Sequence, residues 1–170
     1  MIHADAGFGE FRQQLQGLLD RADDLRPVLT DIGEDVQLVI EEGFESGRRP
    51  LGRRWSPLAK EYARTRVRKG RGRKVLELKG GRGGMLRKSL TGGKASVFDL
   101  SRTEVRVGSK LGIAPPHHKG FSRTIKYPNG RRKRFKIPAR PLLPSANSLR
   151  GRYDDSLRSW LVDGDRGGGL

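Results

Sequence analysis

The segment that most restricts the fold is residues 137–144, Ile-Pro-Ala-Arg-Pro-Leu-Leu-Pro. Its three prolines fix φ, remove backbone N–H donors and hold the preceding residues extended. A helix cannot pass through such a segment, and a central strand would lose hydrogen bonds to its neighbours. The segment is apolar except for Arg140. We therefore expect a rigid strap that lies against the core, joins a sheet to a helix and carries no chemistry of its own.

Charge is distributed unevenly along the chain. Residues 1–45 carry 11 acidic and 3 basic side chains, a net charge of −8, whereas residues 46–140 carry 29 basic and 4 acidic ones, a net charge of +25. Residues 141–170 are neutral, so the 170-residue chain has a net charge of +17. This asymmetry favours either a polyanionic partner such as nucleic acid or subunits that meet acidic face to basic face.

Composition excludes several classes of protein. The chain has no cysteine, which excludes disulfides, thiolate catalysis and cysteine zinc sites. No apolar run approaches the ~20 residues needed to span a bilayer. The first five residues lack the basic and apolar parts of a signal peptide. A cytosolic, non-secreted protein fits these features best, and the length suits one domain.

An apolar stripe runs through residues 8–39. Its members are separated alternately by three and four residues, which keeps them on one face of a helix. They are Phe8, Phe11, Leu15, Leu18, Ala22, Leu25, Leu29, Ile32, Val36 and Val39. Pro27 breaks a continuous helix but suits a first turn, so we expect two helices, at about residues 6–25 and 27–45. We expect the stripe to pack in the core; a coiled coil with a partner is the alternative.

Beyond residue 45 the chain is basic and rich in glycine. Trp55, Pro57 and Leu58 form a compact apolar cluster. We expect this cluster to fill part of the core, as a core plug, in preference to forming a platform on which bases stack. Short helices are expected at residues 59–68 and 85–90, and loops that order on a partner at 68–74 and 79–84. The basic side chains expected to face DNA or a partner here are Arg68, Lys69, Arg71, Arg73 and Lys74.

From residue 95 the period of apolar residues changes to two. Residues 95–100 and 104–108 are expected to form an antiparallel pair. Residues 121–127 and 131–137 are expected to form a hairpin, because the Asn-Gly between them is a strong turn signal. Residues 113–120 are expected to be a loop. Further basic side chains expected to face DNA or a partner are Arg131, Arg132, Lys133 and Arg134.

Aromatic placement bears on whether the hairpin binds nucleic acid by stacking. Ile125 shares a face with Tyr127, and Phe135 shares one with Ile137, while the interleaved basic side chains are expected to point to solvent or to a partner. The basic side chains in question are Arg123, Lys126, Arg132, Arg134 and Lys136. Because the hairpin aromatic residues occupy apolar-face positions, we expect them to lie in the core.

Together these elements predict an α+β fold with N-terminal helices, an antiparallel β-sheet with a basic hairpin, and a C-terminal helix capped by Ser145. We expect a single domain over residues 1–162, followed by a flexible tail at 163–170. Its parts are an acidic helical segment at 1–45, a basic loop-rich segment at 46–93, a sheet and strap at 94–144, and a C-terminal helix at 145–162.

Motifs that would indicate catalysis are incomplete. The glycine-rich stretch around Gly93-Lys94 does not complete a phosphate-binding loop. His117 and His118 have few possible co-ligands, because the only other histidine is His3 and residues 46–140 hold four acidic residues. No nucleophile elbow, HExxH pair or carboxylate dyad is present. We therefore expect no enzyme activity, no cofactor and no metal.

Five short motifs follow one another along the chain. Residues 50–58 resemble P-x-G-x-x-W-x-P-L, 84–89 resemble G-x-L-R-x-S, 104–109 resemble a strand ending in V-G-S/T, 118–121 resemble H-Q-x-G, and 137–143 resemble I-P-A-R-P-F-L. In this order and spacing they resemble the virion morphogenesis (tail completion, S-type) family of tailed bacteriophages. The departures are Lys119 in place of glutamine, Leu142 in place of an aromatic residue, and a longer glycine-rich insertion at 80–84.

The resemblance implies a non-enzymatic structural protein that acts late in assembly, at the neck or the head-proximal end of the tail. It implies a ring of identical subunits around the DNA path, in contact with tail-terminator and head–tail connector proteins, within a virion assembled in the host cytoplasm. It implies motif or interface roles for Trp55, Pro57, Leu58, Leu86, Arg87, Ser89, His118, Gly120, Pro138, Arg140 and Pro141.

Two points remain open on sequence alone. The alternative function is a stand-alone, sequence-nonspecific nucleic-acid-binding protein, whose affinity would fall steeply with salt. Arg140, the one polar side chain of the strap, is expected to pair with a carboxylate, either in its own subunit or across a subunit boundary.

Overall fold

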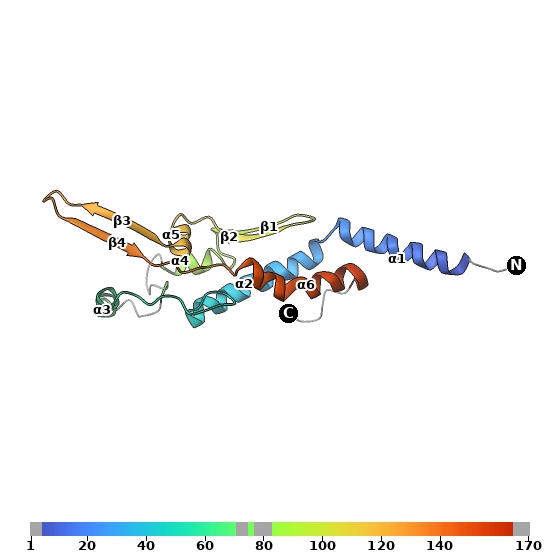
Figure 1. Ribbon diagram of the computed structural model, residues 1–170, viewed down its shortest axis with the longest axis horizontal. Helices are drawn as coiled ribbons and strands as arrows, with labels where there is room; N and C mark the ends of the chain where they lie inside the picture. The colour runs from blue at the N-terminus through green and yellow to red at the C-terminus, as the bar shows by residue number, and fades with distance from the viewer. Residues whose placement is uncertain (1–4, 71–74, 77–82, 165–170) are drawn as a thin grey trace.

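A computed structural model describes residues 5–70, 75–76 and 83–164, with the side chains of residues 5–7 and 83–84 left aside. The molecule is elongated, with helix α1 at one end and the hairpin β3–β4 at the other (Figure 1). The elements follow in the order α1 (Asp5–Asp23), α2 (Arg26–Ser46), α3 (Lys60–Arg68), α4 (Gly83–Lys88), β1 (Ser96–Leu100), β2 (Val105–Ser109), α5 (Ala114–Lys119), β3 (Phe121–Lys126), β4 (Arg132–Ile137) and α6 (Ala146–Asp163).

The predicted α+β fold is confirmed, and most of its elements lie within a few residues of the expected bounds. Pro27 falls in the first turn of α2, where the missing N–H costs no helical hydrogen bond, so the chain forms two helices. The side chain of Ser145 accepts a hydrogen bond from the backbone N–H of Ser148 and caps α6 as predicted.

The prediction of a loop at residues 113–120 was wrong, because α5 forms there. Pro115 and Pro116 lie in its first turn, and proline is tolerated where the N–H has no partner inside the helix. The strands also differ from one continuous sheet. They form two separate antiparallel pairs, with Ser96 opposite Ser109 in β1–β2 and Phe121 opposite Ile137 in β3–β4.

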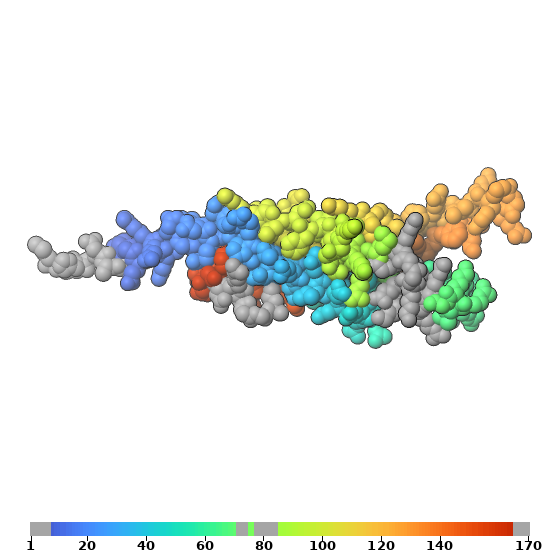
Figure 2. All heavy atoms as spheres, turned by 180° about the vertical axis from the view of Figure 1, so that it is seen from behind, coloured from blue at the N-terminus to red at the C-terminus, as the bar shows by residue number. Residues whose placement is uncertain are grey.

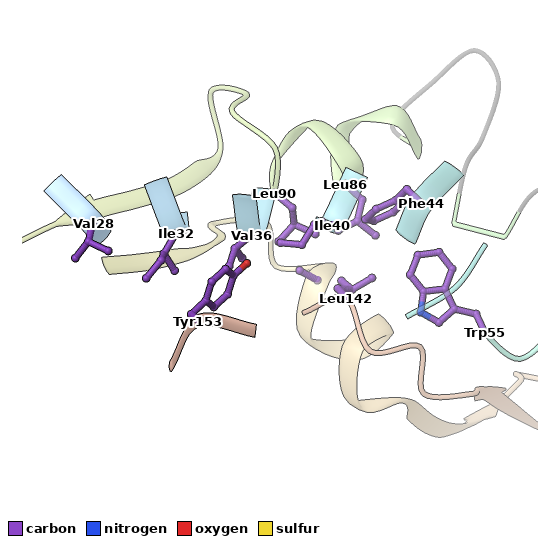
Figure 3. Close-up of a cluster of buried hydrophobic side chains, with 11 residues drawn as sticks. Val28, Ile32, Val36, Ile40, Phe44, Trp55, Leu86, Leu90, Leu142 and Tyr153 are labelled. Carbon is purple, nitrogen blue, oxygen red and sulfur yellow. The ribbon is translucent and has the colours of Figure 1, made fainter. Parts of the chain in front are cut away.

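Helix α2 is the centre of the core. Its residues Val28, Ile32, Val36, Ile40 and Phe44 are four apart and lie on one buried face. Side chains from other elements complete the cluster, and Figure 3 shows most of them around α2. They are Trp55, Leu86, Leu90, Ala114, Leu142 and Tyr153.

The β1–β2 pair lies close against α2. A Cβ atom at Gly33 would lie 2.8 Å from the ring of Phe98 and 2.9 Å from Val105, so only glycine allows this approach. Helix α6 is joined to α2 by a charged contact. Arg152 donates two hydrogen bonds to Asp35, of 2.7 and 3.0 Å, and Tyr153 donates a third. Asp35 is only 8% exposed, so these three bonds satisfy a buried carboxylate.

The predicted apolar stripe splits into two parts. In α2 its members are buried, which confirms the expected core packing there. In α1 the large apolar side chains are between 38% and 65% exposed, so the prediction was wrong for this helix. The physical reason is that most of α1 projects beyond the elements that cover α2, as Figure 2 shows in blue. We call the exposed side chains of α1 the α1 stripe: Phe8, Phe11, Leu15, Leu18 and Leu19.

Replacing Asp35 with asparagine is expected to lower the free energy of unfolding by about 2 kcal/mol at pH 7, because charge-assisted hydrogen bonds are lost. Burial alone would raise the pKa of Asp35, but the hydrogen bonds from Arg152 and Tyr153 outweigh it and lower the pKa. The contribution of Asp35 is therefore present above its ordinary pKa of 3.8 and is lost as the pH falls through the lower folded value. Urea unfolding followed by circular dichroism measures the loss of stability in the variant at pH 7 and its disappearance at low pH.

The matched control is Asp24→Asn, which removes a surface carboxylate paired with Arg26. Exposed pairs contribute little, so this variant should unfold close to wild type. If the two substitutions lowered the free energy of unfolding equally, the buried contact between α2 and α6 would stabilise the fold no more than an exposed ion pair does.

Candidate functional site

The proline strap is held at its centre by a network that we call the strap junction, made of residues 55–57, 117–118 and 137–144. The indole N–H of Trp55 donates to the carbonyl of Pro141 at 2.8 Å. The backbone N–H of Arg140 donates to the carbonyl of His117 at 2.8 Å. The backbone N–H of Leu142 donates to Nδ1 of His118 at 3.0 Å. Three motifs that are distant in sequence therefore meet at one place.

Arg140 holds the strap to the segment after Trp55. It is 4% exposed, and its guanidinium donates to the carbonyls of Ser56 at 2.9 Å and Pro57 at 3.1 Å. Among the described residues Arg140 forms no ion pair, so the predicted carboxylate partner is not found within the subunit. A carboxylate across a subunit boundary stays a prediction. Two fixed carbonyl dipoles replace the carboxylate and satisfy the buried donors. Burial lowers the pKa of Arg140 from its ordinary value.

His118 is held in its neutral form. Burial lowers its pKa, and the nearby charges of Arg49 and Lys119 add to this effect. An Nδ1 atom that accepts the Leu142 N–H must carry no proton, so the geometry and the pKa agree. His117 has a pKa lowered first by burial and then by Arg140. His118 lies inside α5, and its hydrogen bond to the strap gives it a structural role within the subunit. Its implied interface role stays a prediction.

Gly120 allows β3 to leave α5 directly beside the strap. Its φ of 81° and ψ of 161° belong to a region that is essentially restricted to glycine. A Cβ atom there would also lie 2.9 Å from the backbone N of Ala139. Glycine at position 120 is thus required both by the backbone conformation and by the space available for a side chain.

The remaining family-like motifs form a second internal network. Leu86 and Ser89 of α4 are each 2% exposed, and the Ser89 hydroxyl lies 2.7 Å from the hydroxyl of Ser109 at the end of β2. Arg87 forms ion pairs with Glu41 and with Glu45 on α2, the latter at 2.8 Å. The G-x-L-R-x-S and V-G-S motifs therefore fix α4 and β2 onto α2.

Most of the motif residues that the sequence singled out are thus packed inside the protein. Trp55 is 6% exposed, which confirms the core plug, whereas Pro57 is exposed and Leu58 and Pro138 are partly buried. The structure joins the motif residues into two networks and leaves none of them as an open cleft. Their arrangement fixes the strap, α4 and β2 in place, and the predicted interface roles of these residues stay a prediction.

The predicted basic contact residues that the structure describes lie on two elements, the end of α3 and the hairpin β3–β4. Arg68 and Lys69 are exposed at the end of α3, and Arg71, Arg73 and Lys74 lie outside the described residues, as does most of the loop predicted at 79–84. On the hairpin, all four predicted basic residues are exposed. They are Arg131, Arg132, Lys133 and Arg134.

The register of the hairpin separates two faces. One, the hairpin apolar face, carries Phe121, Ile125, Tyr127, Phe135 and Ile137, together with Arg123, Arg131 and Lys133. The other, the hairpin polar face, carries Ser122, Thr124, Lys126, Arg132, Arg134 and Lys136. Arg123 shares its face with Ile125 and Tyr127, because its spacing from them is even. It is exposed, as are the other basic side chains that were predicted to point to solvent or to a partner.

The prediction that the hairpin aromatic residues lie in the core was also wrong. The aromatic side chains Phe121, Tyr127 and Phe135, like Ile125 beside them, are 38–44% exposed, because within the described ranges no element covers β3–β4. This exposure and that of the α1 stripe are the features that sequence reasoning missed. The apolar spacing was visible in both cases, but spacing shows which side chains share a face and says nothing of what covers that face.

The described part of the chain holds no cluster of three acidic or histidine side chains that could bind a metal ion. None of its helices is long and apolar enough to cross a membrane.

The chain is thus an α+β protein in which the short motifs singled out from the sequence hold the helices, strands and strap together. The sequence model of the phage virion morphogenesis family matches residues 7–162, and this chain belongs to that family. Neither the comparison with curated proteins nor that with solved structures gave a match. Membership indicates a structural role in phage assembly and an association with the virion.

Replacing His118 with asparagine is expected to flatten the dependence of stability on pH. The folded pKa of His118 lies below its ordinary value of 6.5, so the unfolded chain takes up a proton first as the pH falls. Wild-type stability should therefore rise between about pH 5 and 7. Asparagine keeps an acceptor for the Leu142 N–H but does not titrate, and unfolding curves across this pH range measure the difference.

His118→Ala is the control, since it removes both the acceptor and the titration. It should lower the free energy of unfolding at pH 7.5 by about 1–3 kcal/mol, because the buried N–H of Leu142 loses its partner. A pH profile of His118→Asn equal to that of wild type would contradict the assigned role of His118.

Proposed function

We propose that this protein is a structural subunit that completes the neck or the head-proximal end of the phage tail and has no catalytic activity. Copies join into a ring around the DNA path and contact tail-terminator and head–tail connector proteins. The proposal rests on membership of the phage virion morphogenesis family and on the shape of the subunit.

The observation that carries the proposal is uncovered apolar surface at both ends of an elongated subunit. The α1 stripe lies at one end and the hairpin apolar face at the other (Figures 1 and 2). Contiguous exposed apolar side chains of this kind mark surfaces that bind another protein. Two different apolar surfaces on one subunit favour a heterologous contact, in which one surface of each subunit binds the other surface of the next. Such a contact generates a closed ring when the rotation from one subunit to the next adds up to a full turn.

The distribution of charge supports the same arrangement. The acidic segment 1–45 contains α1, whereas the hairpin between residues 121 and 137 holds seven basic residues and no acidic one. The two ends of the molecule thus carry opposite charge, which favours the contact of one subunit end with the opposite end of the next. Long-range attraction of this kind also speeds the encounter of subunits at low salt.

Purified protein is expected to form discrete rings, alone or with the neighbouring neck proteins of the same phage. Light scattering gives the mass of the assembly and negative-stain electron microscopy gives its shape. A phage that lacks the gene should accumulate heads and tails that do not join, and added protein should restore joining. Monomers that bind no neck or tail protein, together with normal joining in the mutant phage, would rule out the proposed function.

A specific observation also favours a second candidate function, contact with the DNA backbone. The hairpin polar face presents Lys126, Arg132, Arg134 and Lys136 on one side of an exposed ribbon. A two-stranded ribbon fits the major groove of duplex DNA, and evenly spaced basic side chains neutralise phosphates without reading sequence. A lumen-facing hairpin would then meet the passing genome.

The test is the salt dependence of binding to a short duplex of arbitrary sequence, measured by fluorescence anisotropy. The double variant Arg132→Gln/Arg134→Gln should reduce the slope of log K against log salt by about 2, since each phosphate contact contributes ~0.9. Arg12→Gln on α1, at the other end of the molecule, is the matched control. Absence of binding by wild type at ~50 mM salt would remove the second function.

A further inference from the structure

The hairpin β3–β4 is unusual because none of the elements that the structure describes covers it. A two-stranded hairpin is marginally stable in water and needs further strands or a packed helix to persist. Yet its apolar face exposes Phe121, Ile125, Tyr127 and Phe135, and its pairing is continuous from Phe121–Ile137 to Lys126–Arg132. A helix with an apolar stripe can pack on such a face, because each then buries the apolar side chains of the other.

Helix α1 offers a stripe of this kind. Its apolar side chains fall within an arc of about 100°, the width of a contact surface on one side of a helix. Beside them runs an open groove of about 800 Å³ between α1 and the end of α6. Phe11, Leu15, Leu18 and Val162 give this groove its apolar lining, and Val162 is itself 65% exposed.

We propose that the α1 stripe of one copy packs against the hairpin apolar face of a second copy, so that helix and ribbon form one layered contact between subunits. The inference rests on the self-assembly put forward under Proposed function and names its contact. The protein cannot satisfy the two surfaces by itself, because α1 and β3–β4 lie at opposite ends of its long axis (Figure 1).

The two surfaces match in length. From Phe8 to Leu19 the α1 stripe extends about 17 Å at a helical rise of 1.5 Å per residue. From Phe121 to Tyr127 the hairpin apolar face extends about 20 Å at 3.3 Å per residue. The helix stripe therefore covers the ribbon along its length and leaves neither surface with a large uncovered part.

The two surfaces also match in charge. Arg123, Arg131 and Lys133 share the hairpin apolar face, and no acidic residue lies between 121 and 137. The groove beside the α1 stripe is lined by Glu10 and Asp163. Its one cation, Arg21, already donates to the carbonyls of Leu161 and Val162, each at 2.8 Å. Over α1 as a whole, four acidic residues outnumber Arg12 and Arg21, so the basic ribbon meets a helix of net negative charge.

Pairing of α1 with α1 of a second copy is the main competing contact. It would bury the stripe but leave the hairpin uncovered, and it would place like-charged acidic segments together. It would also produce a closed dimer with two-fold symmetry, which cannot extend into a ring. The helix–ribbon contact satisfies both exposed surfaces and repeats from one subunit to the next.

Cysteine cross-linking tests the contact directly, because the chain has no cysteine of its own. Leu15→Cys and Ile125→Cys are prepared as separate single variants, mixed in equal amounts and oxidised. We expect the mixture to give at least ten times more covalent dimer than either variant alone. The double variant Leu15→Cys/Ile125→Cys should give a ladder of covalent oligomers.

The matched control on the hairpin is Thr124→Cys, whose side chain points to the opposite face from its neighbour Ile125. On the helix it is Gln16→Cys, which lies off the stripe. Neither control should cross-link in the mixture. Equal cross-linking of Thr124→Cys, or efficient linking of Leu15→Cys to itself, would overturn the inference in favour of another contact.

Light scattering on the wild-type protein separates this inference from the proposed function. Oligomers that form without cross-links between Leu15→Cys and Ile125→Cys would overturn the contact and leave ring formation standing. A wild-type monomer that binds no neck or tail protein would overturn both. The substitution Leu15→Glu provides an independent measure, because it leaves the core untouched and should raise the dissociation constant of the oligomer at least ten-fold.

Discussion

The rest of the structure depends on the burial of one face of α2. The side chains of Val28, Ile32, Val36, Ile40 and Phe44 form a continuous row, and β1–β2, α4, α6 and the strap all pack on it or beside it. Two of these elements also form polar contacts with α2 that fix their position. The Asp35–Arg152 contact holds α6, and the Arg87 ion pairs hold α4. Apolar burial supplies the driving force, while the polar contacts determine which element lies where.

The strap junction shows how a proline-rich segment can be structural without regular hydrogen bonding. Proline removes donors, so the segment presents carbonyls and a few N–H groups that must find partners outside any sheet. Trp55, His117 and His118 supply those partners, and Arg140 satisfies the carbonyls of a neighbouring loop in return. The motifs of the family are thus explained by the needs of the framework, and the surfaces that join subunits need not carry them.

Local features of the fold were predictable because their causes are local. Pro27, Ser145 and the Asn129-Gly130 turn each act within a few residues of their position, so helix and hairpin bounds were close to those observed. The helix at 114–119 was not predicted; Pro115 and Pro116 fit its first turn, where a missing N–H costs no hydrogen bond inside the helix. The partners of Arg140 were missed because they depend on a carbonyl geometry that no spacing rule describes.

Exposure was the property that the sequence left undetermined. The same three-and-four spacing is buried in α2 and exposed in α1, because burial depends on which other elements reach each helix. The hairpin follows the same rule: its apolar face is regular, and none of the described elements covers it. The described part of the subunit therefore leaves two apolar surfaces exposed. The contact proposed between two copies would bury both surfaces and give them the apolar centre that protein interfaces have.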